Sequence, residues 1–232
     1  MFNFAPWDTL LHQYVDTQGR VNYSRWKQEQ PQAINQWLKN LEPQNHLSNL
    51  NPDEALALWI NLYNAFTISA ILENYPIRSI QPKILGIPNW IAFLGFFLKP
   101  AYSFAGKHYS LNQIEHGILR REFREPRIHF ALVCASIGCP LLRNSAYEPA
   151  QVRQQLEEDA SRFINNPHKV RYDAQTGRLY CSKIFKWYQK DFLQVSPSIP
   201  EYIRSYLQIE VPIDASTPIS YLHYDWNLNQ TP

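Results

Sequence analysis

The stretch NPDEALALWINLYNAFTISAILENYP, residues 51–76, decides the fold because it predicts one long buried helix. Asn51 is a favoured N-cap, Pro52 suits the first helical position, and two acidic residues follow in the first turn. We expect the helix to run from Ala55 to Glu73 and to end before Pro76. Apolar side chains occur on nearly every face, which indicates a central helix enclosed by the core.

Two asparagines interrupt this apolar helix. Asn61 and Asn64 lie three residues apart and therefore on one helical face. A buried amide is destabilising unless it is hydrogen-bonded. One interpretation is that both side chains tie the helix to neighbouring backbone, and the other is that they orient catalytic groups or line a cleft.

A second apolar run, ILGIPNWIAFLGFFL at Ile84–Leu98, is flanked by Lys83 and Lys99. It is interrupted by Pro88 and Asn89, and it is shorter than the about 20 residues that a membrane-spanning helix needs. We expect a core helix or a hydrophobic hairpin. Contact with a membrane or a protein, self-association, and a flap over a cleft are the alternatives.

The composition excludes several classes of function. The 232 residues carry a net charge of +2, with 45% hydrophobic and 18% charged residues, as in a globular chain. The near-neutral charge gives no electrostatic reason to expect a nucleic-acid partner. Only 7 glycines are present and no GxGxxG or GxxxxGK[ST] motif, which argues against the common nucleotide sites. We expect no organic cofactor.

The remaining elements indicate an α+β fold. The pattern predicts a helix at Ile114–Phe123, a short buried strand at Ile128–Cys134 and a hairpin strand at Arg178–Cys181. Helices and strands are intermixed without regular βαβ alternation, which favours the α+β class. Because no repeat and no flexible linker divides the sequence, we expect a single domain over residues 1–232.

Cys134 is the candidate nucleophile. It ends the expected strand at the mouth of the loop Ala135–Pro140, a place where scaffolds commonly present reactive groups. A neighbouring base can activate a thiol. His116, on the expected preceding helix, could pack back onto the strand, whereas His129 would point to the opposite strand face from Cys134. The alternative is that Cys134 is an inert buried thiol.

The supporting groups are less clearly specified. Glu115 directly precedes His116, and neighbouring helical residues project about 100° apart, so Glu115 would orient the imidazole only in an irregular helix. Asn61 or Asn64 could fill the orienting role instead. Arg120 could anchor a carboxylate or phosphate, although exposed arginines are more often solvated.

The three cysteines are an odd number, so at least one thiol must be free of intramolecular pairing. Free thiols and the lack of a signal-peptide pattern lead us to expect a cytoplasmic protein. The spacing around Cys134 and Cys139 lacks the tight pairs of zinc sites, and we expect no metal. Cys181 lies near Lys183 and Lys186, which could lower its pKa, but a cysteine without a role is favoured there.

Seven collinear segments together resemble the DUF547 family, whose function is unknown: Trp7-Asp8 with Gly19–Tyr23, Ala57–Ala65, Ser110–Arg120, His129–Ser136, Cys139-Pro140, Lys183–Tyr188 and Tyr224–Asn229. The resemblance implies a papain-like or transglutaminase-like layout, with the buried helix packed on a small, mainly antiparallel sheet. It also implies a catalytic set of Glu115, His116 and Cys134. Cys139 matches a position that is Ser in some relatives, which makes it the weaker nucleophile.

The sequence therefore predicts a thiol-dependent hydrolase or acyl transferase. Cys134 would attack the carbonyl of a peptide, amide or thioester, His116 would transfer the proton, and Glu115 would support the imidazolium. Backbone N–H groups near Ala135 would stabilise the oxyanion. The alternative is a non-catalytic interaction domain with a buried Glu, His and Asn network and an apolar docking surface at Ile84–Leu98.

Overall fold

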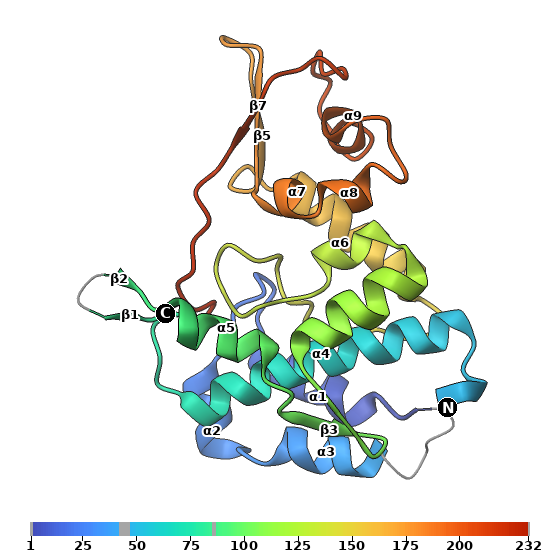
Figure 1. Ribbon diagram of the computed structural model, residues 1–232, viewed down its shortest axis with the longest axis vertical. Coiled ribbons are helices and arrows are strands. Elements are labelled where there is room, and N and C mark those ends of the chain that lie inside the picture. Colours follow the sequence, from blue (N-terminus) through green and yellow to red (C-terminus); the bar gives the residue numbers. More distant parts are fainter. Residues whose placement is uncertain (1, 42–46, 85–86, 232) are drawn as a thin grey trace.

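Helix α4 (Pro52–Asn74) lies at the centre of the computed structural model (Figure 1). The structure describes residues 2–41, 47–84 and 87–231. A capping box closes the N-terminus of α4: the Asn51 side chain accepts from two N–H groups of the first turn, and the Glu54 carboxylate accepts from the Asn51 N–H. Every residue from Leu56 to Leu72 is buried. The prediction of a buried central helix is confirmed.

Helices at the N-terminal end pack against α4 in one hydrophobic core (Figure 1). They are α1 (Ala5–Tyr14), α2 (Tyr23–Glu29) and α3 (Ala33–Leu41), with the short η2 (Leu47–Asn49) leading into α4. Aromatic rings fill this part of the core. Trp7 stacks on Trp37 with ring centroids 5.5 Å apart, and Tyr14 stacks on Trp26 at 4.8 Å.

The apolar run at Ile84–Leu98 forms the second half of a hairpin and then a surface helix. Strand β1 (Lys83–Ile84) pairs antiparallel with β2 (Ile87–Pro88), and α5 (Trp90–Leu98) follows. Leu85 and Gly86 of this run lie outside the described residues. Leu94 and Leu98 on α5 are 48% and 51% exposed. The run contributes a hairpin, as one expectation had it, but α5 is not a core helix.

The segments that carry the candidate catalytic residues are irregular. Element η3 (Gln113–Phe123) is a π-helix, and η4 (Pro126–Phe130) is a 3-10 helix. The expected strand at Ile128–Cys134 is therefore wrong. The backbone of this segment instead contacts α4, where the Asn64 side-chain amide bonds to the Ala131 carbonyl and the Val133 N–H. In a sheet, a neighbouring strand would bind these two backbone groups.

The C-terminal half adds small helices and a three-stranded sheet. Its elements are α6 (Val152–Ile164), β5 (Val170–Asp173), β6 (Arg178–Cys181), α7 (Ile184–Trp187), α8 (Gln189–Phe192), α9 (Ile199–Arg204) and β7 (Ile219–Tyr221). β6 pairs antiparallel with β5 and parallel with β7. A separate hairpin joins β3 (Tyr102–Phe104) and β4 (Lys107–Tyr109).

Helices mixed with small, mostly antiparallel sheets confirm the α+β class. The expectation that the central helix packs on a sheet is wrong, because α4 packs chiefly against η3, α2, α3 and α6. The physical reason is strand length. The strands have two to four residues each and lie at the periphery, too short to cover a helix of 23 residues.

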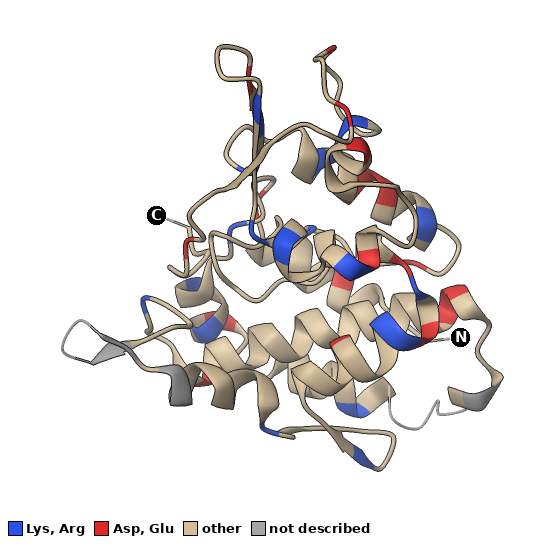
Figure 2. Ribbon diagram, turned by 45° about the horizontal axis from the view of Figure 1, so that its top comes forward, with Lys and Arg blue, Asp and Glu red and all other residues tan. Residues whose placement is uncertain are grey.

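Charged residues of both signs are interspersed on the outer elements, whereas the central helices are almost free of charge (Figure 2). By length and composition, one described helix, α4, is apolar enough to cross a membrane. However, 89% of its most apolar window is buried inside the protein. This burial is typical of a core helix.

Candidate functional site

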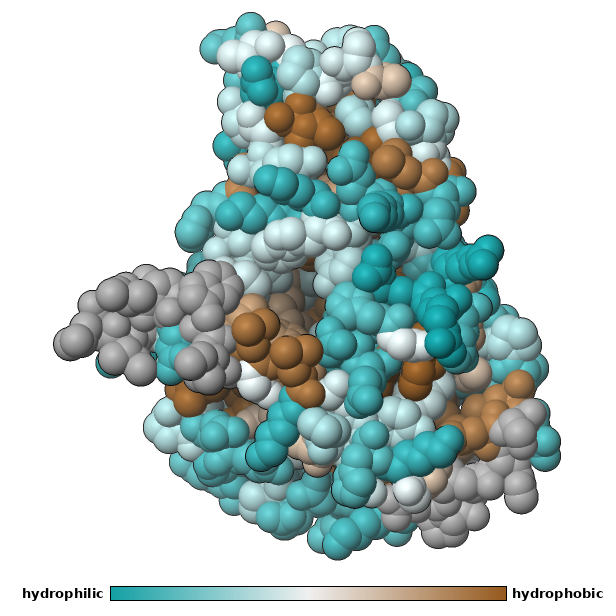
Figure 3. Space-filling model, in the orientation of Figure 1, coloured by the Kyte–Doolittle hydropathy of each residue, from teal (hydrophilic) through white to brown (hydrophobic). Residues whose placement is uncertain are grey.

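A cavity of about 420 Å³ lies between η3, α5, the cysteine loop (residues 134–140) and the C-terminal segment (residues 224–229). In Figure 3 a hollow opens beside the apolar surface of α5. The cavity brings together Glu115, His116 and Cys134, the three residues named for catalysis. Its other walls are mainly apolar and aromatic, from Tyr63, Phe93, Leu94, Phe97, Leu98, Leu132, Ile184, Trp187, Tyr188, Tyr224 and Trp226.

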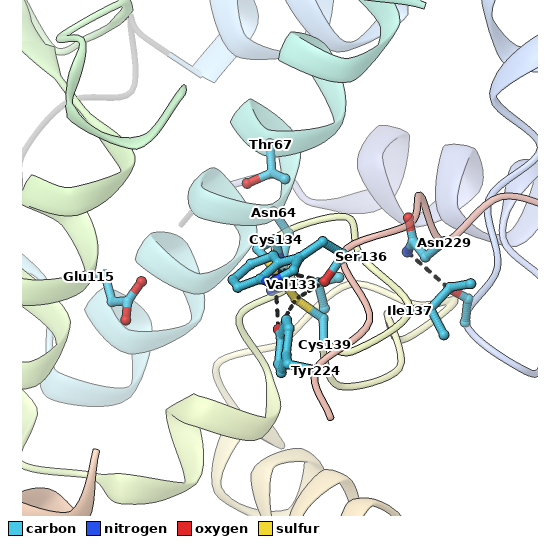
Figure 4. The surroundings of a disulfide bond; sticks show 12 residues. Asn64, Thr67, Glu115, Val133, Cys134, Ser136, Ile137, Cys139, Tyr224 and Asn229 are labelled. Carbon is cyan, nitrogen blue, oxygen red and sulfur yellow. Dashed lines mark hydrogen bonds between the residues drawn. A yellow bond between two sulfur atoms is a disulfide. The ribbon is translucent and has the colours of Figure 1, made fainter. Parts of the chain in front are cut away.

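Cys134 and Cys139 form a disulfide bond across the cysteine loop (Figure 4). The expectation of free thiols therefore holds for Cys181 alone. The spacing of five residues suffices because the loop folds back and brings the two Cα atoms to 6.2 Å. Both sulfur-bearing residues line the cavity, and Cys134 is the more exposed of the two.

Cys181 lies in a different environment. It is fully buried on β6, and burial raises the pKa of its thiol to about 12. The alternative, that Lys183 and Lys186 lower this pKa, is therefore wrong. Proximity in sequence did not bring either lysine close enough to offset the loss of water around the sulfur.

Asn64 fixes the start of the cysteine loop from α4. Its Nδ2 donates to the Ala131 carbonyl and its Oδ1 accepts from the Val133 N–H, both at 3.0 Å. Asn61 makes the same pair of bonds to Tyr147, at 2.8 and 3.0 Å. Both amides tie the helix to neighbouring backbone, as the first interpretation had it. Asn64 does so immediately before Cys134.

The other side of the loop is held by the C-terminal segment. The Ile137 and Gly138 N–H groups donate to carbonyls of residues 225–227, and the Asn229 N–H donates to the Ala135 carbonyl. Gly138 is required at this approach, since a Cβ there would lie 2.7 Å from the Tyr224 ring. The loop is thus clamped between α4 and a segment about 90 residues later in the chain.

Lys169 supports the same loop from within the protein. Its Nζ donates to the carbonyls of Ile137 and Cys139 at 2.6 and 2.8 Å. The lysine is only 8% exposed, and burial lowers its pKa from 10.5 to about 8. The hydrogen bonds that hold the backbone at Ile137 and Cys139 therefore come from an amine whose protonation depends on pH.

The two sulfurs are surrounded by hydrogen-bond donors (Figure 4). The Cys139 Sγ accepts from the Cys134 N–H at 3.0 Å, the Tyr224 hydroxyl at 3.2 Å and the Ser136 hydroxyl at 3.5 Å. The Cys134 Sγ lies 3.3 Å from the Ser136 hydroxyl and 3.5 Å from that of Tyr224. Burial raises the pKa of Tyr224, so its hydroxyl stays protonated and able to donate.

Glu115 is buried and accepts hydrogen bonds from two tyrosines. Its carboxylate accepts from the Tyr63 hydroxyl at 3.2 Å and from the Tyr188 hydroxyl at 2.5 Å. Among the hydrogen bonds of the described residues, it makes none to His116. In Figure 4 the Glu115 carboxylate extends from a helix and lies apart from the loop that carries the two sulfurs. The irregular helix that would let Glu115 orient His116 is present, but that contact is not.

His116 is exposed at the cavity edge and bonds to Arg120, with 2.8 Å between its Nδ1 and the Arg120 Nη1. A guanidinium can only donate, so Nδ1 is the acceptor and the neutral ring carries its proton on Nε2. Arg120 also makes a bidentate pair with Asp191, at 2.6 and 2.8 Å. The His116 ring is therefore held with its Nε2–H as a hydrogen-bond donor.

His129 is a second histidine on the cavity wall. The expectation that it points away from Cys134 assumed an extended strand, but His129 lies in the 3-10 helix η4. Its Nε2 lies 2.7 Å from the Asp191 carboxylate, and its ring stacks on Tyr188 with centroids 3.7 Å apart. Burial lowers the pKa of His129. A neutral ring that donates from Nε2 to Asp191 keeps a lone pair on Nδ1, as a general base requires.

Tyr188, Asp191 and Tyr224 escaped prediction as site residues. They lie some 50 to 90 residues after Cys134 in sequence, and spacing alone gives no sign that they return to it. The available signal was that Tyr188 and Tyr224 fall within segments that resemble the family. In the described part of the chain, no three His, Cys, Asp or Glu side chains gather as a metal site.

The family model "Protein of unknown function, DUF547" matches residues 47–164. The chain belongs to the DUF547 family. The match includes all of Asn64, Glu115, His116, Cys134 and Cys139, whereas the residues that complete the DUF547 site from the C-terminal side lie outside it. No curated protein and no solved structure matches the chain.

Proposed function

We propose that this DUF547 protein is a thiol-dependent hydrolase or acyl transferase with a papain-like use of Cys134. The observation that carries the proposal is the placement of the Cys134 sulfur in one cavity with His116 and His129. In the reduced protein the Cys134 thiolate attacks a carbonyl carbon, and an acyl-thioester forms as the leaving group departs. Water or an amine then takes the acyl group from the sulfur.

Two histidines act on the reacting groups, one by proton transfer and one by a hydrogen bond. His129, oriented by Asp191, accepts the thiol proton at Nδ1, the ring nitrogen left over by its bond to the carboxylate. The His129 imidazolium returns that proton to the leaving group as the leaving group departs, while His116, the base expected from the sequence, donates a hydrogen bond from its neutral Nε2–H to the same group. Glu115 acts through Tyr188, because it holds the hydroxyl of the ring that stacks on His129.

The cavity walls support a substrate with an apolar group beside the reacting carbonyl. Phe93 of α5 packs edge-on against Trp226, with ring centroids 4.9 Å apart, and Phe97 and Trp187 line the same cavity. An apolar pocket with few polar groups suits an acyl chain or an aromatic side chain better than a charged one. We therefore place the substrate among amides, peptides or thioesters whose acyl side is hydrophobic.

A panel of thioesters tests this function. The reduced protein is assayed with acetyl, benzoyl and octanoyl thioesters of one thiol, and release of the thiol is followed by absorbance. We expect the benzoyl and octanoyl compounds to react faster than the acetyl compound and Cys134→Ser to abolish turnover. Cys181→Ser is the matched control and keeps the wild-type rate. Turnover that survives Cys134→Ser would refute the proposal.

The histidine roles are tested with Asp191→Asn and His116→Gln in the same assay. We expect Asp191→Asn to lower the rate of acyl-enzyme formation and to shift its pH profile, because His129 loses its partner. His116→Gln should slow substrates with poor leaving groups more than those with good ones. If both variants match the wild type in rate and pH profile, the histidines are not catalytic.

The interaction-domain alternative has one observation in its favour. Leu94 and Leu98 on α5 and Trp187 on α7 are 46–51% exposed and adjoin the cavity. Such exposed side chains suit docking to a protein or membrane surface through the Ile84–Leu98 run. A reduced protein that stays inert toward every thioester but binds vesicles or a protein through α5 would favour this function.

A further inference from the structure

We propose that Cys134 and Cys139 are a reversible redox pair, in which Cys139 resolves the oxidised form of Cys134. The chemistry of the pair stands on its own, whereas its effect on activity rests on the proposed function. The first observation is the disulfide itself, because the Cys134 sulfur that would act as the nucleophile is bonded in it to Cys139. The second is that the loop holding both cysteines is clamped from three sides and keeps them together after reduction.

Three separate contacts provide this clamp. Asn64 binds the backbone before Cys134, residues 225–229 pair with the middle of the loop, and Lys169 binds the carbonyls of Ile137 and Cys139. None of these contacts involves either sulfur. The two thiols of the reduced protein therefore remain neighbours, so that the disulfide can form again without refolding.

The two sulfurs differ in access. Cys134 is half-buried, whereas Cys139 is 3% exposed. A small thiol or hydroperoxide entering the cavity therefore meets the Cys134 sulfur first. This asymmetry assigns Cys134 as the sulfur that is attacked and Cys139 as the sulfur that leaves or resolves.

The surroundings of Cys139 suit a leaving thiolate. Three donors point at its sulfur: the Cys134 N–H, the Tyr224 hydroxyl and the Ser136 hydroxyl. Hydrogen bonds to the charged form stabilise a thiolate and make it a better leaving group. Two of these donors, Ser136 and Tyr224, also lie within reach of the Cys134 sulfur.

Reduction uses two equivalents of a small thiol. The thiolate attacks the Cys134 Sγ, the S–S bond breaks, and its electron pair leaves on the Cys139 Sγ, which then takes up a proton. A second thiolate attacks the mixed disulfide on Cys134 at the sulfur from the first thiol. The products are the small-molecule disulfide and two protein thiols.

Oxidation uses one equivalent of a hydroperoxide. The Cys134 thiolate attacks the terminal peroxide oxygen and the O–O bond breaks, giving a sulfenic acid on Cys134 and an alkoxide or hydroxide, which takes up one proton from solvent to become an alcohol or water. The Cys139 thiolate then attacks the Cys134 sulfur, and the hydroxyl group leaves as water with one proton. The disulfide removes the nucleophile, and it also prevents further oxidation of Cys134 to the irreversible sulfinic acid.

Peptide mass mapping of the full chain tests the pair. Reduced protein is treated with one equivalent of hydrogen peroxide, quenched with iodoacetamide and digested without reductant. Because residues 128–143 hold no Lys or Arg before Arg143, we expect a single tryptic peptide that carries Cys134 and Cys139 joined by an internal disulfide and without alkyl groups. After dithiothreitol and a second treatment with iodoacetamide, the same peptide should carry two alkyl groups. Cys181 should stay unalkylated until the protein is denatured. Disulfides through Cys181 or between two chains, with none between Cys134 and Cys139, would overturn the proposal.

Cys139→Ser gives a second measurement, and circular dichroism checks its fold. With hydrogen peroxide and the sulfenic-acid probe dimedone, we expect this variant to be labelled on Cys134 and the wild type to escape labelling. Equal labelling of both proteins would overturn the resolving role. Neither readout uses catalysis, so a reversible disulfide in a protein inert to thioesters would refute the proposed function alone. An active protein that forms no disulfide would refute the redox pair alone.

Discussion

Cys134 and Cys139 lie in a loop among hydroxyl and N–H donors, whereas the Cys181 side chain extends from strand β6 into the hydrophobic core and is fully buried. The loop cysteines border a cavity, and burial raises the pKa of the Cys181 thiol to about 12. In sequence, however, Cys181 is the cysteine that lies near two lysines, Lys183 and Lys186. The comparison teaches that tertiary contacts, and not charged neighbours in sequence, set the environment of each cysteine here.

The largest expected effect comes from removing each sulfur in turn. Cys134→Ser should lower thioester turnover by about 10³-fold or more, to the rate of uncatalysed hydrolysis, because a hydroxyl in this site lacks the thiolate form that attacks the carbonyl. Cys181→Ser should change turnover by less than about twofold. Initial rates of the two reduced variants provide the measurement. Comparable losses in both variants would abolish the distinction between the two environments.

Asn64 and Asn61 offer a matched pair of variants on one helix face. Asn64→Ala leaves two buried backbone groups without partners and should lower the free energy of unfolding by about 4 kcal/mol. Asn61→Ala should cost a similar amount for the same reason. Urea denaturation measures both. Only Asn64→Ala should also slow re-formation of the Cys134–Cys139 disulfide, and equal effects of both variants on that rate would contradict the clamp.

Lys169 gives the loop a pH dependence of its own, opposite in sign to that of the buried Cys181 thiol. Because its pKa falls from 10.5 to about 8 on folding, the unfolded chain binds more protons between these pH values. The penalty for burying the charge is fully present below pH 8 and is relieved as the pH rises to 10.5. Relative to Lys169→Met, the wild type should therefore gain about 3 kcal/mol across this window.

Thermal unfolding of the wild type and Lys169→Met at several pH values measures this difference. Tyrosines and other thiols titrate in both proteins and cancel in the comparison. A difference that stays flat from pH 8 to pH 10.5 would mean that the lysine is not buried as described.

The smallest expected effect belongs to Tyr224→Phe, which removes one donor to the Cys139 sulfur and keeps the ring. One lost hydrogen bond to a thiolate should slow reduction of the disulfide by about tenfold. Stopped-flow mixing with dithiothreitol measures the rate. Tyr221→Phe, on β7 beside Cys181, is the control and should leave the rate unchanged. A Tyr224→Phe rate equal to the wild-type rate would show that the Tyr224 hydroxyl does not stabilise the leaving Cys139 thiolate.

The sequence predicted what local pattern controls. The capping residues and apolar faces of residues 51–76 were sufficient for α4, and the segments around Cys134 and His116 predicted their place in one cavity. The strand before Cys134 was predicted wrongly because its apolar composition suits a strand. Contacts from Asn64 override that preference, and no local pattern reveals them.

The hydrogen-bond partners of the site residues were equally out of reach. Glu115 pairs with Tyr188, and His129 with Asp191, across more than 60 residues of chain. The disulfide depends on a loop folded by the C-terminal segment, which a spacing of five residues does not specify. Such pairings follow from the tertiary fold, so periodicity and motif spacing identified the residue types without their partners.

The central claim is that the Cys134 sulfur is the nucleophile of the cavity. Its most direct test is the intact mass of the reduced protein after brief exposure to octanoyl thioester, followed by peptide mapping. We predict one octanoyl group, carried on Cys134 and absent from Cys181. A protein that gains no acyl group, or gains it on another residue while Cys134 stays free, would contradict the account.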